Sequence, residues 1–212
     1  TFYIVQDFAN NVLDTLEPNS ILISAGDTIT GPVWYLQTIG KRPDVLVIDV
    51  NLITNDWYIR NQSIKNPSII NEAWTEINGK DIQRDRLLSI LRNNVTTHDI
   101  YIVTSPTDQT LLQEFDFKQV GIVNKIEIKG SSNVQTNLLL NKKAWSGYTI
   151  REVKSNKYRS PLVEQLADIY AVRLNNIGII YLNNGLIKEA IESFKKSISI
   201  HPDNLVAQQN LD

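Results

Sequence analysis

The sequence predicts an α/β fold: a small three-layer domain with a parallel sheet over residues 1–129, followed by an all-helical segment over 161–212. Two observations carry this prediction. Short apolar runs typical of buried strands alternate with helix-like segments in the first part, whereas the last part has only helical periodicity. Residues 130–160 fit neither period, and a loop of this length inside one domain is unusual. We therefore expect a linker with a packed segment there.

The beginning of the chain supplies two of the predicted strands. Apolar residues recur at helical spacing over 1–20, and the apolar run at 21–24 is a candidate strand. Thr30 is a good N-cap for the next helix, with Pro32 in its first turn. The run at 45–50 is apolar on both faces, which is typical of a strand in a parallel sheet.

The rest of the sheet domain continues the alternation, which favours right-handed crossovers between parallel strands. The predicted elements are a short helix opening at Asp56, a helix over 81–93, a strand over 99–105, a short helix over 107–115, and a fourth strand or strand pair over 119–128. In such a sheet the carboxyl ends of the strands gather one set of loops, and ligands bind there.

Polar and aromatic residues follow the predicted strands at those ends. The candidate ligand-binding residues are Asp27, Thr28, Thr30, Trp34, Asn51, Asp56, Trp57 and Ser105. A polar pocket with tryptophan walls would suit a sugar or a peptide. The alternative is structural: Asp27 and Thr30 cap one helix, Ser105 caps another, and the tryptophans belong to the core. Gly26 and Gly31 do not make a phosphate-binding loop, because neither glycine-rich phosphate motif occurs.

Composition excludes several classes of site. The 212-residue chain has 21 basic and 23 acidic residues, a formal net charge of −2 and no basic stripe, which disfavours nucleic-acid binding. Cysteine is absent, so disulfides, thiolate metal sites and a cysteine nucleophile are excluded. His98 and His201 have no second histidine at metal-ligand spacing, and we expect no metal, no cofactor and no catalytic residue. The sequence contains no run of about 18 apolar residues, so it predicts no membrane-spanning helix.

The clearest pattern lies in residues 171–204, which resemble a tetratricopeptide repeat. Its expected packing residues are Leu174, Gly178, Tyr181, Ala190, Phe194 and Pro202. Small residues stand where two helices would cross closely, and aromatic residues fill the groove beside them. One repeat cannot bury its own apolar face. It is therefore either a structural cap on the first domain or a docking surface for a protein or peptide.

Near the N-terminus, the segments GDTIT, WYLQ, RPDVLVIDVNL and WY between Gly26 and Tyr58 resemble a known family. It is the soluble C-terminal region of bacterial multi-pass membrane proteins of unknown function that are related to protein O-mannosyltransferases. In that family, tetratricopeptide repeats often follow the soluble part, and the repeat pattern has the same place here. Ile29 stands where the family has a second aspartate, so a carboxylate pair at this turn would be incomplete.

The resemblance implies a non-catalytic accessory region of a membrane glycosyltransferase-like protein, on the extracytoplasmic (periplasmic) side of a bacterial membrane. Such a region would bind a protein partner or recognise acceptor proteins, while sugar transfer would belong to the membrane-embedded part of the parent. The chain begins at Thr1 and contains no Met, so we expect a fragment or a processed chain. Two alternatives stay open: a sugar-binding, small-ligand-binding or catalytic module that uses the pocket around Asp27, and a structural spacer.

Overall fold

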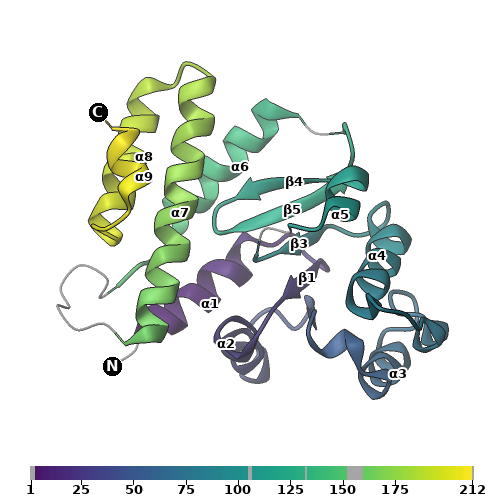
Figure 1. Cartoon of the computed structure of the whole chain (residues 1–212). Coiled ribbons are helices and arrows are strands. Elements are labelled where there is room, and N and C mark those ends of the chain that lie inside the picture. Colours follow the sequence, from purple (N-terminus) through teal and green to yellow (C-terminus); the bar gives the residue numbers. More distant parts are fainter. Residues whose placement is uncertain (1–2, 105–106, 132, 152–159, 212) are drawn as a thin grey trace. The chain divides into compact units, whose positions relative to one another are not determined.

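The computed structural model describes residues 3–104, 107–131, 133–151 and 160–211, and Figure 1 labels its elements. The chain forms two compact units. The sheet unit comprises Leu16–Lys118 and Val123–Ser132; the helical unit comprises Thr1–Thr15, Gln119–Ile122 and Asn133–Asp212. Neither unit is continuous in sequence, which differs from the continuous first domain, 1–129, that the sequence predicts.

The described part of the sheet has five strands in the order β2-β1-β3-β5-β4. They are β1 (Ile21–Ser24), β2 (Leu46–Asp49), β3 (Ile100–Ile102), β4 (Phe115–Val120) and β5 (Val123–Ile128). β1 lies between β2 and β3 and is parallel to both, with Ile23 opposite Ile48 and Ile102. β5 is antiparallel to β3, with Ile100 opposite Ile126.

The predicted α/β fold is therefore confirmed, but the sheet is mixed rather than parallel throughout. Only Gly121 and Ile122 separate β4 from β5, whereas a parallel connection needs a crossover of a dozen or more residues. Of the two alternatives for residues 119–128, the strand pair is correct, and its first strand begins earlier, at Phe115. Because the two strands form a hairpin, they run in opposite directions, and the sheet cannot be parallel throughout.

The core of the sheet unit forms around β1, whose four residues are all buried, as in a strand covered on both faces. One buried cluster joins Ile21, Ile23 and Ile48 to apolar residues of α3 (Asp56–Lys65) and α4 (Ile82–Asn94). The unit's other helical elements are α2 (Asp27–Thr38), α5 (Gln109–Glu114) and the short 3-10 helices η1 (Leu52–Thr54) and η2 (Glu72–Glu76).

Helix α2 begins at Asp27, before the predicted N-cap Thr30. Gly26 is the N-cap residue, with φ 78°, and its carbonyl accepts hydrogen bonds from the amides of Ile29 and Thr30. Glycine adopts such a positive φ without steric cost. The prediction that Thr30 caps the helix is therefore wrong: the chain turns earlier, at the glycine, and Thr30 is buried within α2.

The helical unit contains α1 (Tyr3–Thr15), α6 (Val134–Gly147), α7 (Pro161–Asn183), α8 (Ile187–Ile200) and α9 (Leu205–Gln209). α6 lies within the interval 130–160, for which the sequence predicts a linker with a packed segment. α7 and α8 pack against each other, and a methyl group on Gly178 would lie 2.4 Å from the Phe194 ring. The close approach of these two helices therefore requires the glycine.

Buried polar side chains attach α1 to the rest of the helical unit. The Asn11 amide donates a hydrogen bond to the Tyr170 hydroxyl of α7 at 2.7 Å. Asp7 is buried and accepts hydrogen bonds from the backbone amide of Arg151, at 2.9 Å, and from its guanidinium. The first helix therefore groups with the helical unit and not with the sheet.

Candidate functional site

The polar residues at the ends of β1 and β2 form a hydrogen-bond network around Asp49. This carboxylate is 4% exposed and accepts hydrogen bonds from the Thr30 hydroxyl at 2.6 Å and from the amides of Gly26 at 3.2 Å and Asn51 at 2.8 Å. The hydroxyls of Ser24 and Thr30 are also hydrogen-bonded, at 2.9 Å. Asp49 thereby fixes the turns that follow both strands, and both of its oxygens are used by the protein itself.

The other predicted pocket residues differ in their surroundings. Asp27 is exposed in the first turn of α2, where its negative charge suits the positive end of the helix dipole. Thr28 and Trp34 are half-buried on the same helix, and Trp57 on α3 is 60% exposed. Ser105 lies outside the described residues. The structure brings Thr30 and Asn51 together through Asp49, and a ligand pocket around Asp27 stays a prediction.

Asp56 is held by a buried arginine, Arg86 of α4. The Arg86 side chain is only 1% exposed, and its Nη2 lies 2.5 Å from an Asp56 oxygen. The same guanidinium donates to the carbonyls of Ile53 and Trp74, each at 2.9 Å. Arg86 therefore ties η1, η2 and α3 together, which is a structural task. Among the described residues, no group of three histidine or acidic side chains could hold a metal ion.

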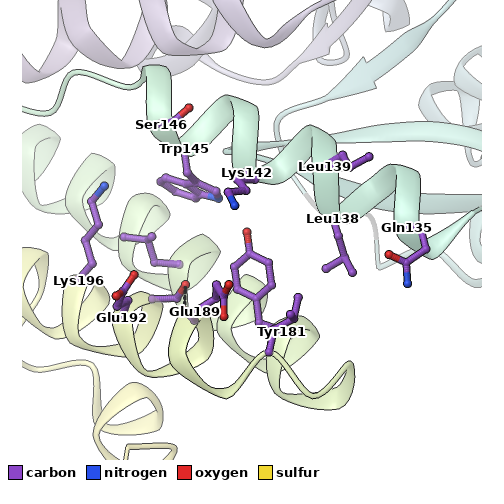
Figure 2. Close-up of a pocket in the computed structure, with 13 residues that line it drawn as sticks. Gln135, Leu138, Leu139, Lys142, Trp145, Ser146, Tyr181, Glu189, Glu192 and Lys196 are labelled. Atoms are coloured by element: carbon purple, nitrogen blue, oxygen red, sulfur yellow. Dashed lines mark hydrogen bonds between the residues drawn. The ribbon is translucent and has the colours of Figure 1, made fainter.

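A cavity of about 410 Å³ lies inside the helical unit (Figure 2). One face of α6, from Gln135 to Ser146, forms its first wall, and the residues of α8 from Glu189 to Lys196 form the second. Leu174 and Tyr181 of α7 and Leu186, the residue before α8, complete the lining. The volume is in the range of sites that bind small ligands, and no residue of the pocket predicted at the strand ends contributes to it.

The cavity combines apolar walls with polar atoms that lack partners. The indole Nε1 of Trp145 is buried and has no hydrogen-bond partner among the described residues. Figure 2 shows the Tyr181 hydroxyl directed toward α6. Burial, and to a lesser extent the nearby Glu189 carboxylate, raise the pKa of Tyr181, so this hydroxyl keeps its proton at neutral pH. Trp145 and Tyr181 thus offer hydrogen-bond donors beside an apolar surface.

Four charged side chains also line the cavity: Lys142, Lys196, Glu189 and Glu192. Lys142 projects from α6 and the two glutamates from α8 (Figure 2). Lys196 also lies on α8, so one wall carries a single cation and the other carries two anions and a cation. Within the described part of the chain, no ion pair joins Lys142 to either glutamate. The formal charge of the lining is zero, because two cations and two anions contribute.

Comparison with protein families identifies the larger part of this chain. The family described as TMEM260-associated domain 2 matches residues 5–143, which is more than half of the sequence. The chain belongs to this family. A tetratricopeptide repeat matches residues 171–204, the same range that the sequence analysis predicts. The TMEM260-associated domain 2 match runs from α1 into α6, so it includes part of one cavity wall, and the repeat supplies the other.

A curated relative gives this TMEM260-associated domain 2 protein a wider context. Over 79 residues the chain is 28% identical to a mouse protein named "Protein O-mannosyl-transferase TMEM260". The match covers 36% of this chain and 11% of the mouse protein, so the chain corresponds to a small part of that relative. No solved structure matches significantly. The resemblance to a family related to O-mannosyltransferases is confirmed, and bacterial origin stays a prediction. No described helix is both long and apolar enough to cross a membrane.

Proposed function

We propose that this chain is a non-catalytic accessory region of a membrane-embedded, glycosyltransferase-like protein and that its helical unit binds a protein partner. The tetratricopeptide repeat carries the proposal, because stacked helical repeats create extended binding surfaces. The curated relative, named as a protein O-mannosyl-transferase, supports the kind of parent protein. We further propose that the partner is an acceptor protein and that binding occurs on the extracytoplasmic side of a bacterial membrane.

The surface of the repeat supports a protein partner. Leu182 near the end of α7, and Ile187 and Ile191 on α8, are large apolar side chains that are exposed. Ile187 and Ile191 are four residues apart and therefore lie on the same face of α8. Exposed apolar side chains that are neighbours on a surface mark protein interaction sites in many proteins. Two buried charged groups of the sheet unit support a non-catalytic role, because the Asp49 carboxylate and the Arg86 guanidinium already bind the protein's own backbone.

Site-specific photo-crosslinking in the full-length parent protein, expressed in its own cells, tests this proposal. A photoreactive amino acid replaces Ile187 or Ile191 on α8. A control replaces Tyr35, which is an exposed apolar residue of α2 in the sheet unit. We expect a crosslinked protein from the two α8 positions and none from Tyr35. A parent protein that is intact but crosslinks to no protein from either α8 position would favour a structural spacer.

The acceptor hypothesis has its own readout. If the partner is an acceptor, mass spectrometry of the crosslinked protein should find a sugar that is lost when the parent gene is deleted. An unmodified partner would leave protein binding in place and exclude acceptor recognition.

A further inference from the structure

The cavity between α6 and α8 has chemistry that specifies its occupant more closely than the repeat alone. Its apolar lining includes Leu138 of α6, Leu174 of α7 and Leu186, the residue that precedes α8. Leu139 on its rim is 69% exposed. A leucine-rich hollow of about 410 Å³ is larger than one side chain needs, and it can take an apolar side chain together with a short stretch of main chain.

The polar atoms around this hollow match the main chain of a peptide. A peptide carbonyl can accept the hydrogen bond that the buried Trp145 Nε1 does not make within the described residues. A peptide amide can donate to Glu189 or Glu192 on the opposite wall. Because the four charges of the lining cancel, a neutral segment is favoured over a strongly charged one.

A sugar fits the same cavity less well. Sugars commonly stack on an open aromatic face, but the surroundings of the Trp145 ring are already occupied. Tyr148 packs edge-to-face at a centroid distance of 5.0 Å, and the Lys196 Nζ lies over the ring at 5.9 Å. The edge that carries Nε1 therefore supplies the unused chemistry of Trp145, and that edge suits a hydrogen-bond acceptor.

We propose that the cavity between α6 and α8 binds a neutral, extended peptide segment of a partner protein, with one apolar side chain among the leucines and a carbonyl on Trp145 Nε1. The proposal rests on the proposed protein-binding function and names its site and the chemistry of its ligand. It also gives α6 a role: the helix closes a binding cavity on the repeat.

Nuclear magnetic resonance of the ¹⁵N-labelled whole chain tests the proposal through the indole N–H signals. The chain has four tryptophans, and Trp145→Phe assigns the relevant signal by its loss. The probes are capped, uncharged Ser-Gly peptides with a central Leu-Leu, and matched peptides with Lys-Lys, Glu-Glu or Ser-Ser. We expect the Leu-Leu peptide to move the Trp145 indole proton downfield in a saturable manner. The signals of Trp34, Trp57 and Trp74 then serve as internal controls that do not move.

A pair of matched variants locates the site. Leu139→Glu places a charge on the cavity rim and should weaken the Leu-Leu peptide about tenfold. The control is Leu205→Glu on α9, because Leu205 is 66% exposed and Leu139 is 69% exposed. This control should leave the affinity for the Leu-Leu peptide within about twofold of its original value. Three outcomes would overturn the proposal. The Lys-Lys or Glu-Glu peptide could bind as tightly as the Leu-Leu peptide, or the Trp145 indole signal could stay in place at every soluble concentration of the Leu-Leu peptide. The third outcome is a shift of this signal with methyl mannoside alone. Crosslinks from Ile187 or Ile191 without a Trp145 shift would refute this site and leave protein binding intact.

Discussion

The contact between Gly178 and Phe194 gives the sharpest test of the packing in the helical unit. In Gly178→Ala the new methyl carbon would lie 2.4 Å from Phe194 Cε1 and 2.7 Å from Cδ1, whereas carbon atoms prefer about 3.5–4.0 Å. Phe194 is fully buried, so its ring has to move against its neighbours. Overpacking of this kind costs about 1–3 kcal/mol, and the better helix propensity of alanine returns about 1 kcal/mol. We expect a net loss of roughly 1 kcal/mol.

Urea unfolding followed by circular dichroism measures this difference, and a second background separates its two causes. In Phe194→Leu the ring is absent, so adding Gly178→Ala should stabilise that variant by up to about 1 kcal/mol. Gly147→Ala, where the new methyl meets nothing within 4 Å, is the control and should change stability by less than about 0.5 kcal/mol. If Gly178→Ala stabilises the natural sequence as much as it stabilises Phe194→Leu, the close approach of the two helices is refuted.

Three further predictions concern two buried contacts and one ion pair at the surface. Arg86→Met leaves several buried carbonyls without their donor, and we expect a loss of about 3–5 kcal/mol in urea unfolding. Gly121→Ala combines φ 60° with a methyl only 1.8 Å from the Tyr148 hydroxyl; it should cost about 3 kcal/mol or more, and Tyr148→Phe should recover part of that loss. The Arg42 guanidinium holds the pKa of Asp44 well below its usual range. Because the folded-state pKa is the lower one, the stabilisation is complete above about pH 4 and is lost as the pH falls further. Asp44→Asn should therefore lower the urea midpoint near neutral pH and have little effect in acid.

The sequence predicts those features that depend on neighbouring residues or on a fixed period. The repeat is visible in the sequence because small and aromatic residues stand at the positions that the packing of two helices requires. These residues are Gly178, Tyr181, Ala190 and Phe194, and the predicted range of the repeat is confirmed. The strands β1 and β2 are visible because short apolar runs stand between polar turns. The start of α2 is misplaced because two local signals compete: Thr30 is a good capping residue, but Gly26 can take a positive φ and ends the turn earlier.

Features that depend on residues far apart in the chain are not predictable in this way. Arg86 has the local pattern of a solvated residue, and only its contacts with Ile53 and Trp74 account for its burial. The cavity needs α6 to pack near α8, and nothing in either helix alone indicates its partner. The Asp49 network likewise joins the ends of two strands, and the hydrogen bonds between them are not visible in either turn alone.

The hydrogen bond between Asn11 and Tyr170 has a consequence for how the chain is made. The two residues are 159 positions apart, and at about 5–20 residues per second roughly ten to thirty seconds of translation separate them. During that interval the apolar residues of α1, such as Ile4 and Phe8, have no completed helical unit to pack against. Helix α1 is therefore made well before the residues of α7 that it contacts in the folded unit. A nascent chain that stalls before α7 should consequently be a good substrate for chaperones.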